Sequence, residues 1–332
     1  RIGVTRVRLA GIGGVATART HRHRGLMQET AKTCVDGLLS AGYDMSLLFG
    51  IPGFYERYGY VSTFSENIAV LDAANIVPLE PALSHAVYED ADSMERFAAQ
   101  YNAENELVTG TFVRPTFLAN PRRKHWHCYT FDGGYVVAGK RHGNLEVVDC
   151  AGPPASVIDL VRQLAERQFT PEIHFVFLPR RSPMGEYLYS VSHRFIMSHS
   201  PNGGAMVKIV NLESAVRKLV PELERRLTAS PLADYSGRLR LCSDNGCVSV
   251  TVAAGRFGEV VAEAGPDGAP GAKRPADGEI RAGAALARLL IGDDEPGRIC
   301  RQEGITLRGD AVHLVPILFP DQEPSTVLWD RF

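Results

Sequence analysis

A run of cationic side chains stands directly before a glycine near the start of the chain. Residues 16–28 read ATARTHRHRGLMQ, and the run consists of His21, Arg22, His23 and Arg24, followed by Gly25. The residues that follow have the apolar spacing of a helix. Unpaired backbone N–H groups and the helix dipole favour anions at a helix start. The pattern therefore predicts an anion site, most simply one for phosphate.

Three other interpretations of this run are open. A metal site built on His21 and His23 needs further ligands, and none stands close by in the sequence. A nucleic-acid surface needs basic residues spread over a face, whereas these are confined to one turn. A solvated helix start without function is the third. The anion site is favoured because Gly25 lets backbone approach a ligand and because Arg22 and Arg24 offer planar donors to diphosphate oxygens.

The elements that must position this run are a strand before it and a helix after it. Residues 7–18 predict a buried strand that is irregular at Gly13 and Gly14. Residues 25–41 predict a helix that stops at Gly42. Residues 45–50 predict a short apolar strand, and residues 51–64 a turn, a short helix and a further strand. This alternation of strands and helices is typical of an α/β layout.

The rest of the chain predicts two more blocks of mixed structure. The second has a helix at 90–106 with Asp90 or Asp92 near its start, a hairpin at 133–152, a helix at 154–169 and a strand at 172–179. The third has a strand and then a helix capped by Asn211, alternating strands over 236–261, a loop at 264–279 and a helix at 281–291. We expect domains at 1–75, 76–203 and 204–332.

Composition limits the classes of protein to which the chain can belong. It has 332 residues, 45% hydrophobic and 22% charged, which is typical of a globular protein with ample core. The formal net charge of -2 provides no general attraction to nucleic acid or to anionic membranes. No apolar run approaches the roughly 18 residues of a membrane span. The six cysteines are scattered, so we expect reduced thiols and a cytoplasmic protein.

Residues 15–60 resemble the acyl-CoA motif of the GNAT N-acetyltransferase superfamily. The matching segments are GGVATARTHRHRGLM and MSLLFGIPGFYERYGY. In the family's Q/R-x-x-G-x-G/A turn, Arg22 takes the first place and Gly25 the second, whereas Met27 stands where a glycine or alanine is usual. The pair THRHRGL and FYERYGY is similar to Eis-type acetyltransferases (enhanced intracellular survival).

The resemblance implies a fold, a reaction and a set of site residues. The fold would be α/β (α+β), with GNAT-type mixed sheets in two tandem domains, the second degenerate, and a C-terminal sterol-carrier-protein-like domain. The first strands of the catalytic domain are expected to precede Arg1. Acetyl-CoA would be the co-substrate, without a metal. The family pattern assigns its binding to Val15, Ala16, Thr17, Arg22, His23, Arg24, Gly25, Leu26 and Met27.

Two residues receive catalytic roles from the same resemblance. Tyr55 matches the tyrosine that protonates the leaving thiolate, and a phenol with a pKa of about 10 stays protonated for that task. Core packing is the alternative role, since four aromatic residues crowd this turn. Phe332 matches the family's terminal phenylalanine, whose carboxylate accepts the amine proton. A frayed tail is the alternative there.

The resemblance thus implies a bacterial N-acetyltransferase that acts through a ternary complex. The acceptor would be a small-molecule or peptide amine, such as an aminoglycoside-like polyamine or a lysine. No nucleic-acid or membrane partner is expected. The family's relatives assemble as hexamers, so the resemblance implies a homo-oligomer. Two alternatives stay open: a non-catalytic acyl-CoA or lipid-binding protein, and a scaffolding protein with degenerate GNAT parts. Fold analogy alone does not decide among them.

Overall fold

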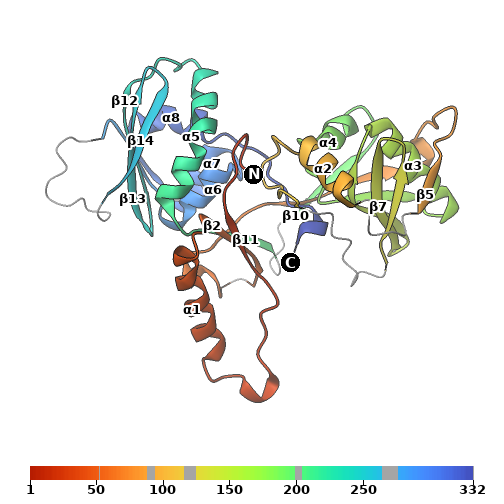
Figure 1. The fold of residues 1–332 in the computed structure, drawn as a ribbon, viewed down its shortest axis with the longest axis horizontal. Coiled ribbons are helices and arrows are strands. Elements are labelled where there is room, and N and C mark those ends of the chain that lie inside the picture. The colour runs from red at the N-terminus through yellow and green to blue at the C-terminus, as the bar shows by residue number, and fades with distance from the viewer. Residues whose placement is uncertain (52, 88–93, 116–124, 199–203, 264–275, 332) are drawn as a thin grey trace. The chain divides into compact units, whose positions relative to one another are not determined.

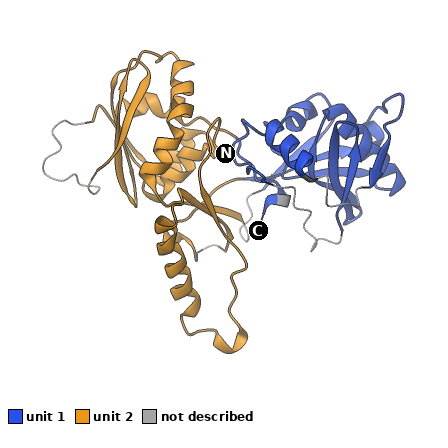
Figure 2. Cartoon of the chain, viewed as in Figure 1, with its two compact units in different colours: residues 1, 65–199, 323–331 blue, residues 2–64, 200–322, 332 orange. Residues whose placement is uncertain are grey.

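The chain forms two compact units of mixed helices and sheets, coloured separately in Figure 2. The computed structural model describes residues 1–51, 53–87, 94–115, 125–198, 204–263 and 276–331. Unit 1 comprises residue 1 with residues 65–199 and 323–331, and unit 2 comprises residues 2–64 and 200–322. The predicted mixed α+β class is confirmed, whereas the division into three domains stays a prediction.

Unit 2 contains a four-stranded sheet whose strands come from distant parts of the chain. Its order is β1-β2-β11-β3, with β1 (Leu9–Ile12), β2 (Met45–Gly50), β3 (Val61–Ser62) and β11 (Gly204–Ile209). β1 runs parallel to β2, while β11 is antiparallel to both β2 and β3. Figure 1 shows β2 and β11 side by side, next to α1 (Leu26–Ser40). Residues 204–209 therefore complete the sheet that begins at residue 9.

The two parallel strands separate at one end. Their pairing stops at Ile12 opposite Leu48, while β2 continues to Gly50 in register with β11. The predicted strand over 7–18 is thus wrong in its extent, because only Leu9–Ile12 is paired. The glycine-rich sequence explains the early end: glycine has low strand propensity, and Gly14 takes a φ of 64°.

The helix that follows agrees with its prediction over residues 25–41. α1 is preceded by η1 (Arg19–His21) and capped by Gly25, which lies in the left-handed region at φ 76°. Gly42, also at φ 76°, stands just after the helix. The strand predicted at 45–50 and the turn, short helix and strand at 51–64 are also confirmed, the short helix being η2 (Glu56–Tyr58).

Unit 2 also contains a five-stranded sheet covered by helices. Its order is β14-β13-β12-β15-β16, with β12 (Gly237–Ser243), β13 (Gly246–Ala253), β14 (Arg256–Glu263), β15 (Gly278–Arg281) and β16 (Thr306–Gly309). The accompanying helices are α5 (Leu212–Thr228), α6 (Leu286–Ile291), α7 (Pro296–Glu303) and α8 (Ala311–Leu318), together with the 3₁₀ turn η4 (Gly283–Ala285).

Three predictions for the segments around this sheet can be compared with the structure. Asn211 caps α5 as predicted, because its side chain accepts a hydrogen bond from the N–H of Ser214 at 3.0 Å. The helix predicted over 281–291 is shorter, since Gly283 takes a φ of 53° and residues 283–285 form a 3₁₀ turn instead. Only residues 276–279 of the predicted loop at 264–279 lie within the described residues.

Unit 1 is built on a seven-stranded sheet in the order β10-β4-β9-β8-β7-β6-β5. Its strands are β4 (Glu66–Asp72), β5 (His85–Val87), β6 (His127–Phe131), β7 (Gly134–Arg141), β8 (Asn144–Ala151), β9 (Glu172–Val176) and β10 (Arg194–Ser198). Its helices are α2 (Met94–Glu104), α3 (Pro154–Arg167) and α4 (Pro183–Leu188), with the 3₁₀ turns η3 (Ala73–Asn75) and η5 (Leu328–Asp330).

The predicted elements of the second block recur in this unit. The hairpin at 133–152 corresponds to β7 and β8, the helix at 154–169 to α3, and the strand at 172–179 to β9. The helix at 90–106 corresponds to α2, but Asp90 and Asp92 lie outside the described residues. α3 packs its apolar face on the sheet, where Val157, Leu160 and Val161 join the core.

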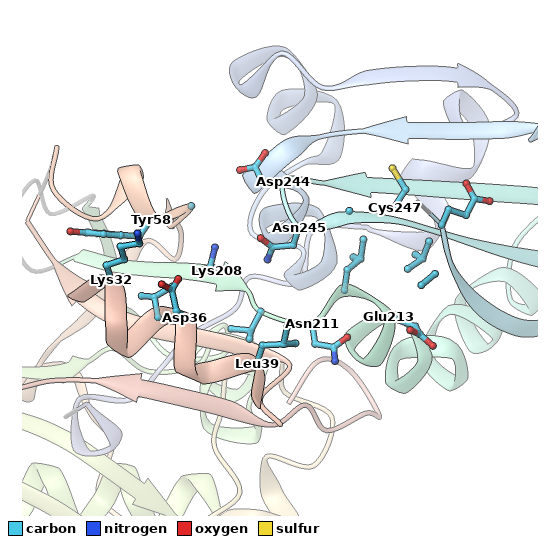
Figure 3. Close-up of a pocket in the computed structure, with 18 of the residues that line it drawn as sticks. Lys32, Asp36, Leu39, Tyr58, Lys208, Asn211, Glu213, Asp244, Asn245 and Cys247 are labelled. Atoms are coloured by element: carbon cyan, nitrogen blue, oxygen red, sulfur yellow. The ribbon is translucent and has the colours of Figure 1, made fainter. Parts of the chain in front are cut away.

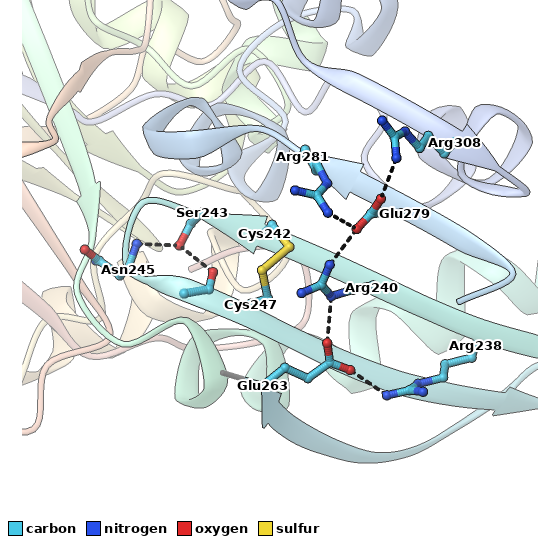
Figure 4. The surroundings of a disulfide bond; sticks show 11 residues. Arg238, Arg240, Cys242, Ser243, Asn245, Cys247, Glu263, Glu279, Arg281 and Arg308 are labelled. Carbon is cyan, nitrogen blue, oxygen red and sulfur yellow. Dashed lines mark hydrogen bonds and ion pairs between the residues drawn. A yellow bond between two sulfur atoms is a disulfide. The ribbon is translucent and has the colours of Figure 1, made fainter. Parts of the chain in front are cut away.

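The expectation that the thiols are all reduced is wrong in one place. Cys242 on β12 and Cys247 on β13 form a disulfide, which Figure 4 shows beside a row of arginines and glutamates. The two residues lie directly opposite each other across the hairpin, with Cα atoms 4.1 Å apart. Their spacing in sequence lacks a known motif, but the short turn between the strands brings the two side chains onto one face.

Candidate active site

The segment after β1 leaves several backbone donors open. Val15 and Ala16 are exposed and Thr17 is half-buried, in the stretch where β1 has separated from β2. Among the described residues, no acceptor pairs with the N–H groups of Val15, Thr17, Leu26 or Met27. The last two belong to the first turn of α1, where the helix dipole adds positive potential. Together these groups can receive the oxygens of an anionic or carbonyl-bearing ligand.

The cationic run has two different roles in the loop. The Nε of Arg22 donates a hydrogen bond to the carbonyl of Thr17 at 3.2 Å, which ties the two ends of the loop together. The Nδ1 of His21 lies 2.9 Å from the hydroxyl of Thr20. The side chains of His23 and Arg24 are exposed and have no partner among the described residues, so they are available to a ligand.

Met27 stands at the position for which the resemblance to the GNAT superfamily implies glycine or alanine. Its side chain packs against the cluster of Leu48, Tyr55, Tyr60 and Met206. The larger side chain is therefore placed on the core side of α1, while Gly25 supplies the left-handed backbone before the helix. Leu26 is exposed at the helix start. The departure from the pattern is thus accommodated by the core.

The turn after β2 places Tyr55 on the same side of the sheet as α1. Tyr55 is 7% exposed, and its ring meets Phe54 edge-on with centroids 4.8 Å apart. Its hydroxyl has no hydrogen-bond partner among the described residues. Burial, and to a smaller degree the nearby Tyr58, raise the pKa of Tyr55. The phenol therefore keeps its proton at neutral pH and can donate it.

Two neighbours fix the position of the Tyr55 ring. The hydroxyl of Tyr58 donates to the carbonyl of Gln28 at 3.2 Å and so ties this turn to the first turn of α1. Gly50 leaves space for the ring, because a Cβ there would lie 2.8 Å from Cδ2 of Tyr55 and 2.6 Å from Cδ1 of Leu48. Sequence reasoning missed Gly50, whose only signal was a glycine at the end of an apolar strand.

Tyr60 has a structural position behind the site. It is 1% exposed, and its hydroxyl donates to Ser46 at 2.7 Å, which in turn donates to the carbonyl of Ala10 at 3.1 Å. Burial raises the pKa of Tyr60 to about 12, although the bond to Ser46 lowers it. The chain of hydrogen bonds joins the Tyr55 turn to β1 through β2. Tyr60 is thus satisfied, whereas the Tyr55 hydroxyl is not.

The proposed base, Phe332, lies outside the described residues. The residues before it are anchored on unit 1. Arg114 forms an ion pair with Asp330 at 2.7 Å, and Arg331 forms one with Glu66 at 2.6 Å. The tail up to Arg331 is therefore held by ion pairs.

A buried polar network under this tail was not found from the sequence. Arg114 also pairs with Asp149 at 2.6 Å, and Asp149 accepts from the hydroxyl of Tyr135 at 3.1 Å. Tyr101 donates to Asp330 at 3.0 Å. The only signal was Asp149 inside the apolar strand LEVVDCA.

The described residues contain no group of three or more histidines, cysteines and carboxylates placed to hold a metal. Within the same residues, none of the helices combines the length and the apolar character needed to span a bilayer.

Comparison with known proteins relates this geometry to a family. Residues 1–62 match the family described as acetyltransferase (GNAT) domain. No curated protein matches the chain significantly. A GCN5-related N-acetyltransferase from Kribbella flavida matches with a TM-score of 0.70 at 18% identity, over 100% of this chain and 82% of that one.

Two other solved structures agree over the full chain. A GCN5-related N-acetyltransferase from Anabaena variabilis has a TM-score of 0.69 at 17% identity, and Eis1 from Mycobacterium abscessus a TM-score of 0.67 at 17%. Each match covers 100% of this chain and 84% of the matched chain. At such identities the likeness shows the fold, while the family match covers β1, α1 and Tyr55. Residues 1–62 therefore carry a GNAT acetyltransferase domain, and the protein is an acyltransferase.

Proposed function

We propose that the protein is an acetyl-CoA-dependent N-acetyltransferase of Eis type. The observation that carries the proposal is the set of open N–H groups on the loop after β1 and on the first turn of α1, next to a buried tyrosine whose hydroxyl has no partner among the described residues. In this proposal the first turn of α1, with Gly25, His23 and Arg24, holds the diphosphate. Arg22 keeps the loop closed through Thr17.

The chemistry requires a polarised thioester and two proton transfers. The N–H groups of Val15 and Thr17 would receive the carbonyl oxygen as it becomes an oxyanion. The acceptor nitrogen forms a bond to the carbonyl carbon while the carbon–sulfur bond breaks. Tyr55 then gives its proton to the leaving thiolate, and the carboxylate of Phe332 takes the proton of the amine.

Several finer assignments belong to the same proposal. The acceptor would be a polyamine, an aminoglycoside-like molecule or a peptide lysine, in a cytoplasmic enzyme that assembles as a homo-oligomer. The five-stranded sheet with its helices would be the sterol-carrier-like domain of Eis-type proteins. The order of elements along the chain supports the last of these assignments, as does the fold likeness to Eis1 from Mycobacterium abscessus.

The experiment measures release of the CoA thiol from acetyl-CoA with a panel of amine acceptors. Tyr55→Phe should lower kcat by about a hundredfold or more, the usual contribution of a positioned proton donor. Tyr43→Phe, which removes the hydroxyl of a half-buried tyrosine outside this turn, serves as the matched control and should leave kcat nearly unchanged. Deleting Phe332 tests the proposed base. Tight acetyl-CoA binding without turnover on any amine would instead favour the acyl-CoA-binding alternative.

Arg24→Gln tests the diphosphate assignment separately. It should raise the KM for acetyl-CoA while leaving kcat nearly unchanged, because it removes a contact made equally before and during reaction. Lys32→Gln, which removes an exposed cation further along α1, is the control. An unchanged KM in Arg24→Gln would place the diphosphate elsewhere.

A further inference from the structure

Unit 2 contains a cavity of about 860 Å³ that the proposed reaction does not use. It is lined by one face of α1, by the η2 turn, by β11 and by the turn between β12 and β13. The residues from α1 are Lys32, Val35, Asp36 and Leu39, whereas the proposed diphosphate site lies at the opening turn of that helix. The cavity is therefore distinct from the loop at 13–25.

Lys208 of β11 lines this cavity, and the side chains on either side of it on the same face are apolar. Met206, two residues earlier on the same face of β11, and Val210, just after the strand, are 3% and 7% exposed. Both pack with α1 residues in two core clusters. Lys208 itself is half-buried. Figure 3 shows its side chain between α1 and the turn that carries Asp244. An amine is thus held where the strand pattern would place an apolar side chain.

The ammonium nitrogen of Lys208 has no hydrogen bond or ion pair with any residue that the structure describes. Asp36 and Asp244 are near enough to influence it electrostatically but do not pair with it. Gly59 leaves room for it, because a Cβ there would lie 2.7 Å from Nζ. The amine is therefore desolvated on one side and open to the cavity on the other.

This environment shifts the amine toward its neutral form. Burial lowers the pKa of Lys208, and the two carboxylates, Asp244 and Asp36, offset that effect only in part. A desolvated lysine is a stronger nucleophile at neutral pH than an exposed one, because more of it carries the free electron pair. The other ionisable side chains that line the cavity are Lys32, Arg57, Tyr58, Glu213 and Glu263.

We propose that Lys208 is a self-acylation site, which takes an acyl group directly from an acyl-CoA thioester that enters the cavity. Nζ attacks the thioester carbonyl, the new carbon–nitrogen bond forms, and the carbon–sulfur bond breaks to release the CoA thiolate. The extra proton of the nitrogen passes to Asp36, to Asp244 or to water. The product is an uncharged amide on β11, and the only co-reactant is the acyl-CoA itself.

The test uses the full chain with acetyl-CoA and no amine acceptor. Acetylation of each lysine is followed over time by peptide mass spectrometry, after hydroxylamine has removed any ester or thioester adducts. Lys32 is the internal control, since it is an exposed lysine on the wall of the same cavity. We expect Lys208 to be acetylated several-fold faster than Lys32 at neutral pH, and its rate to level off at a lower pH. Each unit of pKa lowering gives about tenfold more free amine below the pKa.

Three comparisons make the outcome decisive. Denaturing urea should abolish the preference for Lys208, because the preference depends on the folded cavity. Lys208→Arg should remove the modification, and the wild-type measurement stands even if this variant fails to fold. Tyr55→Phe should leave acetylation of Lys208 unchanged, which separates this site from the proposed transferase site. Equal rates at Lys208 and Lys32, or a preference that survives urea, would overturn the proposal.

Discussion

At the scale of single residues, the candidate site depends on how the Tyr55 ring is packed. The ring packs between Phe54 and Tyr60, and its hydroxyl has no partner among the described residues. Packing and chemistry are thus compatible in one side chain: the ring fills the core and the hydroxyl remains free to donate. Gly50 leaves space for the ring, because it has no side chain that would occupy that position.

Gly50→Ala should therefore impair the site without touching a ligand. The new Cβ would lie within 2.9 Å of Leu48, Tyr55 and Met206, so the ring must move. We expect a loss of about 1–3 kcal/mol in unfolding free energy, as for other overpacked cores, together with a fall in kcat. Urea unfolding and thiol-release assays measure the two effects.

The control for Gly50→Ala is Gly37→Ala on α1. Gly37 lies inside the helix, and an added Cβ meets nothing within 4 Å. The same substitution there should stabilise the protein by about 0.5–1 kcal/mol and leave kcat unchanged. If Gly50→Ala behaves like Gly37→Ala, the ring is not held as described.

The protonation of Tyr55 gives a prediction about pH. A proton donor works only below its own pKa, and burial raises the pKa of Tyr55 above its ordinary value of 10.0. Activity that depends on Tyr55 should therefore persist up to pH 10 and be lost only above it. The measurement is kcat against pH with saturating substrates and short assay times. A fall in kcat below pH 9 that is absent in Tyr55→Phe would contradict this assignment.

At the scale of elements, α5 holds the first residues of unit 2 through a buried carboxylate. Glu222 is fully buried, pairs with Arg226 at 2.7 Å and Arg225 at 2.6 Å, and accepts from the N–H of Val4 at 3.1 Å. Gly3 lies so close that a Cβ there would meet the carboxylate at 2.2 Å. One helix side chain thus fixes the segment that leads into β1.

Glu222→Gln should destabilise unit 2 and change its response to acid. Burial alone would raise the pKa of Glu222, but hydrogen bonds from Arg225 and from the N–H of Val4 lower it below 4.5. A lowered folded-state pKa gives stability that is present above the unfolded value and lost as pH falls through the folded one. The variant leaves two arginines without their partner, which costs about 3–5 kcal/mol for a buried pair.

Urea unfolding at pH 7 and at pH 4 measures both parts of this prediction. The variant should be less stable than the wild type at pH 7, and the difference should shrink at pH 4. Glu213→Gln, an exposed pair with Arg217 on the same helix, is the control and should change little. An equal difference at both pH values would show that folding does not lower the pKa of Glu222.

The elements also show which features a sequence can predict. α1 and α3 were predictable because their apolar spacing repeats over three or more turns. β1 was overextended because an apolar, glycine-rich stretch does not reveal where pairing stops; the end depends on the course of β2. Gly50 could not be found because its role depends on how the Tyr55 ring and Met206 of β11 pack around it. The partners of Asp149 could not be found because Arg114 and Tyr135 are distant from it in sequence. The position of the cationic run before α1 could be predicted because a helix start needs only local residues, and the anion site itself stays a prediction.

At the scale of the whole molecule, unit 2 is assembled from two separated segments. β3 and β11 are paired at Met206 and Ser62, and the N–H of Thr63 donates to the carbonyl of Ala205 at 2.9 Å. The residues that flank the intervening segment are therefore neighbours in space. Residues 65–199, the main part of unit 1, are inserted in the sequence between two strands that would otherwise form a tight hairpin.

This arrangement predicts that residues 65–203 can be replaced by a short glycine-rich turn. The resulting chain, with residues 2–64 joined to 204–322, keeps every strand of both sheets of unit 2. It should give a cooperative urea transition and dispersed amide resonances, because the β3–β11 pairing is retained. Residues 1–64 alone should remain unfolded, since β3 pairs only with β11 in the described sheet. A folded 1–64 fragment would contradict this view.

The late position of β11 also has a consequence during synthesis of the chain. The edge of β2 that β11 covers is made about 150 residues before its partner. At ribosomal rates of about 5–20 residues per second, that edge waits on the order of 8–30 s for its partner. An uncovered strand edge can pair with another chain during that interval. Newly made acyltransferase domain is thus most exposed to aggregation before residue 209 leaves the ribosome, and chaperones that bind nascent chains should protect this interval.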